Sequence, residues 1–99
     1  MPLAYFVVRA TVADAAKRKA FDEWYSREHL PDAAKAFGVK KAWRFWSVND
    51  PSLHEAMYEF ADQAALDRAM SGEALKTLVA ELVTRTREIL VLAEEFAVA

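Results

Sequence analysis

The strands that this sequence predicts carry large apolar side chains on both faces, and this feature limits the possible folds most strongly. Residues 3–12, 39–48, 53–60 and 88–98 are rich in β-branched and aromatic types and are predicted to form strands. A sheet that helices cover on one side should be polar on the other. A bare apolar face of more than a few hundred Å² is unusual on a monomer. We therefore expect a second copy of the chain to cover the sheet.

Length and composition agree with this expectation. The 99 residues are expected to form one domain, 1–99. A chain this short buries only about 60–65% of the surface that it exposes when unfolded, so its own core is thin. Yet 55% of the residues are hydrophobic, above the usual ~45–50%. The excess is typical of a chain that buries part of its surface in a homodimer.

Helical segments separate the predicted strands. Asp14 is expected to cap a helix over 15–30, and Pro31 to end it and begin a short helix that stops at Gly38. Later, Asp62 is expected to cap a helix over 63–70, and Ser71 to cap the next helix. In that last helix, apolar residues follow the i, i+3, i+4, i+7, i+8 spacing of an amphipathic helix without a miss; they are Leu75, Leu78, Val79, Leu82 and Val83.

This β-α-β-β-α-β order predicts an α+β fold of ferredoxin-like type, with a four-stranded antiparallel sheet and helices on one face. Sheet-to-sheet pairing of two such subunits would give a dimeric α/β barrel.

Several classes of function are disfavoured. The net charge of −2 gives no electrostatic footprint for nucleic acid, and the absence of cysteine excludes thiol chemistry and thiolate metal sites. The chain has only two histidines, without metal-ligand spacing, and no glycine-rich phosphate loop. The apolar run over 3–8 is too short for a signal peptide or a membrane span. We expect a cytoplasmic protein with neither metal nor cofactor.

The stretch "FDEWYSREHLPDAAKAFGVKKAWRFW" resembles the EthD-like branch of the dimeric α+β barrel superfamily. In that branch, an acidic and aromatic helix ends in a Tyr-x-x-x-His-x-Pro pattern, which Tyr25, His29 and Pro31 match. A short helix, a glycine and a strand with an aromatic residue and an arginine follow, matched by Gly38, Trp43 and Arg44. The resemblance spans nearly the whole chain.

The resemblance implies the barrel fold and a dimer, and it leaves the chemistry open. Relatives in the superfamily include cofactor-independent monooxygenases, polyketide cyclases, muconolactone isomerases and haem-degrading or haem-peroxidase proteins. One histidine could ligate haem as in some of these, although nothing in the sequence selects that role.

Three residues are candidates for catalysis. His29 is a candidate proton carrier, because imidazole titrates near neutral pH and because the matching histidine of the family lies by the ligand cavity. The alternative is a histidine at a helix end, stabilised in its charged form by the helix dipole. Tyr25 would orient a substrate oxygen, or would simply be an aromatic at the core edge. Arg44 would stabilise an oxyanion, or would pair with Glu59 on the neighbouring strand.

Four aromatic residues could line a ligand cavity, or could instead serve the core or the dimer contact; they are Trp43, Trp46, Tyr58 and Phe21. His54 is expected at the surface near a hairpin. The sequence thus predicts a homodimer that binds a small apolar or aromatic molecule, with cyclase, isomerase, dehydratase or monooxygenase chemistry. The alternatives are a non-catalytic binding or stress-associated module, and a sheet face that serves assembly only, with a filled interior.

Overall fold

The structure, a computed structural model, describes the backbone of residues 3–86 and 90–98 and the side chains of residues 3–82. Strands and helices follow one another in the predicted order, with a π-helical turn, η1, inserted between the first two helices. The elements are β1 (Leu3–Thr11), α1 (Ala15–Trp24), η1 (Tyr25–His29), α2 (Leu30–Phe37), β2 (Lys41–Trp46), β3 (Leu53–Phe60), α3 (Gln63–Met70), α4 (Glu73–Thr86) and β4 (Leu90–Val98).

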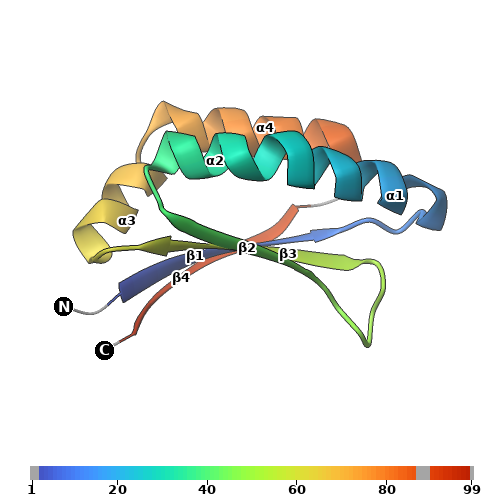
Figure 1. The fold of residues 1–99 in the computed structure, drawn as a ribbon, viewed down its shortest axis with the longest axis horizontal. Helices are drawn as coiled ribbons and strands as arrows, with labels where there is room; N and C mark the ends of the chain where they lie inside the picture. Colours follow the sequence, from blue (N-terminus) through green and yellow to red (C-terminus); the bar gives the residue numbers. More distant parts are fainter. Residues whose placement is uncertain (1–2, 87–89, 99) are drawn as a thin grey trace.

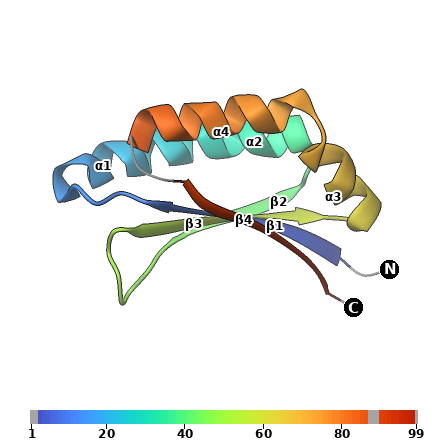
Figure 2. The same ribbon diagram turned by 180° about the vertical axis from the view of Figure 1, so that it is seen from behind.

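The strands form one antiparallel sheet in the order β2-β3-β1-β4. All the helices lie on one side of this sheet, where α1 and α2 follow one another in one continuous rod and α4 lies beside that rod (Figure 1). The view from behind shows the same two layers and an opposite sheet face that no helix covers (Figure 2). The predicted α+β class with ferredoxin-like topology is therefore confirmed.

The core fills the space between the sheet and the helices. Alternate residues of β1 point into it and are buried, as the alternation in the sequence predicts. The sheet is in register such that Phe6 pairs with Tyr58 and Val8 with Ala56. Helix α4 adds Leu78 and Leu82 from its apolar stripe. Residue Val83 of that stripe, the apolar run of residues 89–92 and the acidic pair Glu94 and Glu95 lie outside the described side chains.

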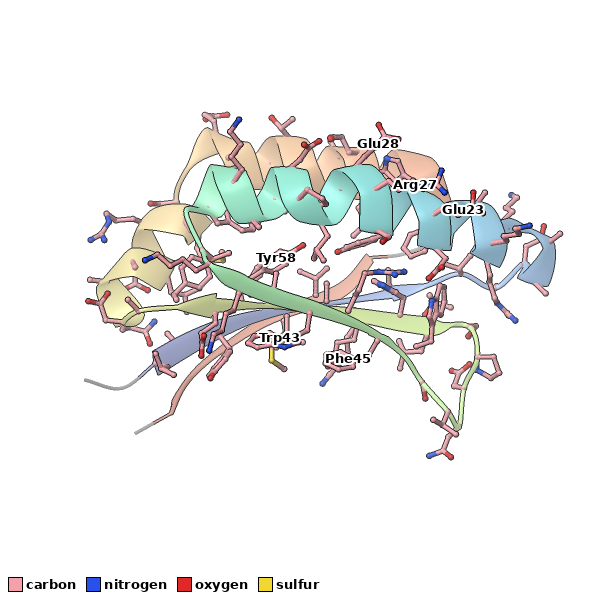
Figure 3. The ribbon with its side chains drawn as sticks, viewed as in Figure 1. Glu23, Arg27, Glu28, Trp43, Phe45 and Tyr58 are labelled. Atoms are coloured by element: carbon pink, nitrogen blue, oxygen red, sulfur yellow. The ribbon has the colours of Figure 1, made fainter. Side chains whose placement is uncertain are left out.

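The face of the sheet that points away from the helices also carries large apolar side chains. On the edge strand β2, Trp43 is 38% exposed and Phe45 is 47% exposed. Both point away from the helices, whereas Tyr58 of β3 lies between the sheet and the helices (Figure 3). Polar contacts between β1 and β3 interrupt this apolar surface: Arg9 Nε pairs with Glu55 Oε1 at 2.9 Å, and the Tyr5 hydroxyl donates to Glu59 Oε1 at 3.0 Å.

The prediction that Pro31 ends the first helix is wrong. Leu30 is helical, with φ −64° and ψ −48°, and the chain continues from α1 through η1 into α2 without a break. In η1, the Leu30 N–H donates to the Tyr25 carbonyl, five residues back. Proline lacks an N–H and its ring crowds the preceding turn. A wider π turn directly before the proline accommodates the missing N–H and the crowded ring. The helix therefore continues as one rod.

Of the other predicted helix ends, three are confirmed and one differs. The carboxylates of Asp14 and Asp62 accept backbone N–H groups at the starts of α1 and α3. Gly38 ends α2 in the left-handed conformation, with φ 70°. Ser71 does not begin α4, because its hydroxyl donates to carbonyls in the last turn of α3 and so closes the preceding helix.

Candidate functional site

The π turn places the side chains of Tyr25 and His29 together beneath the helix. Tyr25 is 1% exposed and His29 is 4% exposed. Their rings meet edge to face, with centroids 4.7 Å apart. The Trp24 ring stacks on His29 at 4.6 Å between centroids and also contacts the Tyr25 ring at 5.7 Å. The motif tyrosine and histidine therefore form one buried unit that faces the sheet.

A small cavity of about 20 Å³ lies against this unit, between α2, α4 and the sheet. Tyr25, His29 and Tyr58 supply its polar groups. One water molecule fits in a space of this size, whereas pockets for organic ligands usually measure ~300–1,000 Å³. The interior is thus nearly filled in this conformation. The remaining lining is apolar and comes from Phe6, Val8, Ala33, Phe37, Leu75, Leu78, Val79 and Leu82.

Burial keeps His29 uncharged at neutral pH. Loss of hydration lowers the pKa of His29 from 6.5 to about 4, and the negative charge of Asp32 opposes this shift only in part. The Nδ1 atom is buried and has no hydrogen-bond partner among the described residues. His29 does not end a helix, because α2 continues beyond it, so the proposed stabilisation of its charged form by the helix dipole does not apply. A neutral imidazole can accept a proton.

Two phenols face each other beside the cavity. The hydroxyl oxygens of Tyr25 and Tyr58 are 3.4 Å apart, and either one can be the donor. Burial raises the pKa of Tyr58 to about 12 and that of Tyr25 well above its usual value. Both phenols therefore keep their protons and can donate to an oxygen atom of a ligand.

Arg44 approaches Tyr25 from the edge strand, but it pairs with a residue that the sequence did not suggest. Its Nη2 donates to Oδ1 of Asp22 on α1, and Trp46 Nε1 donates to the same oxygen at 2.8 Å. These two bonds, with that from Trp46 the larger cause, lower the pKa of the Asp22 carboxyl. The predicted partner, Glu59, lies on the other face of the sheet and accepts from the Tyr5 hydroxyl at 3.0 Å. Arg44 Cζ lies 5.7 Å from the centroid of the Tyr25 ring.

His54 is buried and not at the surface, which corrects the expectation from the sequence. It is 1% exposed and lies against Tyr25, with ring centroids 4.5 Å apart. The turn residues before it are typical of an exposed hairpin, and they led to the prediction that His54 is exposed. The alternation along β3 gave the better signal, because His54 shares its face with Ala56, Tyr58 and Phe60, which are all buried.

The other aromatic candidates do not gather in one place. Tyr58 lines the cavity with His29. Phe21 and Trp46 instead pack around His54, with ring centroids 5.1 and 5.0 Å from it. Trp43 is on the opposite face of the sheet and cannot contact the same ligand as His29 within one subunit (Figure 3).

In the described part of the chain, no group of three or more His, Cys, Asp or Glu side chains is arranged to hold a metal ion. No helix within residues 3–86 combines the length and the apolar character needed to cross a membrane.

No family model and no curated protein matches the sequence. Solved structures do match. An ethyl tert-butyl ether D (EthD) family protein from Bacillus halodurans superposes with a TM-score of 0.71 and 19% identity, over 97% of each chain. The chain shares the fold of an EthD family protein. HapK from Hahella chejuensis has a TM-score of 0.67 and 20% identity over 98% of this chain and 90% of its own.

SnoaB from Streptomyces nogalater, a cofactor-independent oxygenase, also has this fold. It matches with a TM-score of 0.66 and 18% identity, over 98% of this chain and 91% of its own. Identities this low establish the fold alone. The EthD-like resemblance found in the sequence is confirmed at that level.

Proposed function

We propose that this protein, as a single domain over 1–99, forms a homodimer in which each subunit binds a small apolar or aromatic organic molecule between its helices and its sheet. We further propose cofactor-independent acid–base chemistry on that molecule. The observation that carries the proposal is the buried pair of Tyr25 and His29, which lines a cavity between the helices and the sheet whose wall is otherwise mostly apolar.

In this proposal, each polar residue has a defined role. Neutral His29 accepts a proton from an activated carbon or hydroxyl of the substrate. The hydroxyls of Tyr25 and Tyr58 donate to the oxygen on which negative charge develops. Arg44 lies over the ring of Tyr25, with its Cζ 5.7 Å from the ring centroid, and its positive charge adds to the electrostatic potential at the cavity. Cyclisation, isomerisation, dehydration and oxidation of an activated ring all begin with such a proton transfer.

Binding of a ring-sized molecule requires the cavity to widen. Four of its lining residues, from Leu75 to Leu82, belong to α4. Outward movement of α4 would enlarge the space without disturbing the hydrogen bonds of the sheet. This part of the proposal predicts that ligand binding alters the amide-exchange rates of α4 more than those of β1 and β3.

The dimer would form through the uncovered face of the sheet. Tyr5, Trp43, Phe45 and Met57 line a shallow groove of about 400 Å³ on that face. An exposed apolar surface of this kind is typical of a subunit interface. Sedimentation at micromolar concentration tests this: the wild type should run as a dimer and Trp43→Glu as a monomer. A wild-type protein that runs as a monomer would contradict the dimer.

The binding and proton-transfer steps can be tested separately with 2-tetralone, an aromatic ketone with an acidic C–H bond. Calorimetry measures binding, and proton NMR in D₂O measures deuterium exchange at that carbon. We expect the wild type to accelerate exchange, and His29→Gln to abolish the acceleration while it still binds the ketone. Glu28→Gln is the matched control, because Glu28 is exposed on the outer side of the helix next to His29 (Figure 3). Equal exchange rates in the two variants would refute the role of His29.

A second candidate function is ligand binding without catalysis. The pKa of His29, at about 4, favours it, since an imidazole that binds protons so weakly is a poor base at neutral pH. Binding of 2-tetralone by the wild type with no gain in exchange would support this candidate. Absence of any binding would instead support a protein whose apolar surfaces serve assembly only.

A further inference from the structure

Both histidines of the chain are buried, and both lie against the same tyrosine. The chain has two histidines. His29 contacts the Tyr25 ring from the same helical rod at 4.7 Å, and His54 contacts it from β3 at 4.5 Å, between ring centroids. The sequence motif and the proposed mechanism account for His29. They give no role to His54.

His54 sits in a costly environment for an imidazole. Its neighbours are the rings of Phe21, Tyr25 and Trp46. Its Nε2 is buried and has no hydrogen-bond partner among the described residues. An unpaired buried polar nitrogen destabilises a fold, whereas an apolar side chain of similar size would not carry that penalty. Stability alone therefore does not favour a histidine at this position.

The contacts of His54 form part of a closed ring of five side chains that includes Tyr25. Asp22 accepts hydrogen bonds from Arg44 and Trp46. Arg44 lies over the ring of Tyr25, which contacts His54, and His54 in turn contacts Trp46. The ring joins α1 and η1 to the strands β2 and β3. Within it, Arg44 contacts the Tyr25 ring from β2 and His54 contacts it from β3, and the hydroxyl of Tyr25 meets Tyr58 at the cavity.

We propose that His54 is a positioning residue of the candidate site, which acts through Tyr25. Its ring fixes the orientation of the Tyr25 phenol, so that the hydroxyl remains beside Tyr58 and faces the cavity. This inference rests on the proposed function for its ligand, and on the contact geometry for its mechanism.

A double-mutant cycle tests the inference. We expect His54→Leu to weaken binding of 2-tetralone by about tenfold when Tyr25 is present. In the Tyr25→Phe background the hydroxyl is gone, so the same substitution should change binding by less than about twofold. Equal effects in both backgrounds would overturn the inference, because a merely structural histidine would act independently of that hydroxyl.

Stability provides a second readout. His54→Leu removes the unpaired nitrogen and should resist urea as well as, or better than, the wild type. Leu66→Val is the matched control, since Leu66 is fully buried on α3 and outside the cavity lining. We expect this control to lower the urea midpoint and to leave the binding of 2-tetralone unchanged. A His54→Leu chain that fails to fold would overturn the inference, because the histidine would then be required for packing.

The third readout needs no ligand and separates the two proposals. Aromatic NMR measures the rate at which the Tyr25 ring flips. We expect faster flips in His54→Leu and unchanged flips in Leu66→Val. If the wild type does not bind 2-tetralone, the proposed function fails, and the flip rate alone then decides whether His54 positions Tyr25. Unchanged flips in His54→Leu would contradict the inference whatever the binding result.

Discussion

Acidification should destabilise this fold through its two buried histidines. The pKa of His29 is lowered to about 4 and that of His54 to about 3, in both cases chiefly by loss of hydration; for His54, the charge of Arg44 adds to the effect. An unfolded histidine titrates near 6.5. As the pH falls below that value, the unfolded chain takes up protons that the folded chain does not bind, so the free energy of unfolding decreases.

The size of the effect follows from the pKa values. Each pH unit below the unfolded pKa lowers the free energy of unfolding by ~1.4 kcal/mol per histidine, until the folded pKa is reached. Between about pH 7.5 and about pH 5, each histidine should therefore cost about 2 kcal/mol, and the two together about 4 kcal/mol. For a domain with a total stability of ~5–15 kcal/mol, this is a large fraction. The carboxylates contribute mainly at lower pH.

Urea denaturation at fixed protein concentration and at these two pH values measures the loss. The free energy of unfolding of the wild type should fall by about 4 kcal/mol between the two pH values. That of His29→Gln or His54→Leu should fall by about half as much. Because the chain has no other histidine, the free energy of unfolding of the double variant should be nearly independent of pH in this range. If the double variant loses as much stability as the wild type, the pKa values assigned to these residues are wrong, and other groups dominate.

Three further substitutions test separate parts of the fold. Asp62→Ala removes the cap of α3 and should lower the free energy of unfolding by about 1 kcal/mol, measured by urea denaturation. Gly38→Ala should cost about 1 kcal/mol from backbone strain alone, since φ is 70° and no atom lies within 4 Å of an added Cβ; a neutral effect in the same assay would contradict this. Asp22→Asn removes the charge that pairs with Arg44 and should lower the free energy of unfolding by about 1 kcal/mol in urea denaturation at low salt. The loss should be smaller in concentrated salt, because Asp22 is half-exposed and salt screens the pair.

The sequence is a good guide to the elements of this fold wherever local chemistry decides the structure. The alternation of apolar residues along β1 and β3 predicts which face is buried. Asp14 and Asp62 mark helix starts because a carboxylate satisfies free N–H groups. Gly38 marks a helix end because it adopts positive φ without strain. Each of these signals depends on a few consecutive residues.

The partners of charged residues could not be predicted in the same way. From the sequence, Arg44 and Glu59 lie on neighbouring strands and carry opposite charge. They are on opposite faces, however, because Arg44 pairs in register with Ala56, whose side chain faces the helices. Asp22 becomes the partner of Arg44 only when α1 packs across the edge strand. The distance between Asp22 and Arg44 depends on this tertiary packing and cannot be read from their spacing in the sequence.

The two main errors of the sequence interpretation both fall beside Tyr25. The sequence predicts that Pro31 ends the helix, yet a π turn carries the helix through and sets Tyr25 and His29 side by side. It also predicts His54 at the surface, yet this residue is buried against the same tyrosine. Local rules are expected to fail where function or strain imposes a geometry that stability would not select. π turns are also enriched at functional sites. The position of the two failures therefore supports the assignment of the site to the surroundings of Tyr25, independently of any resemblance to other proteins.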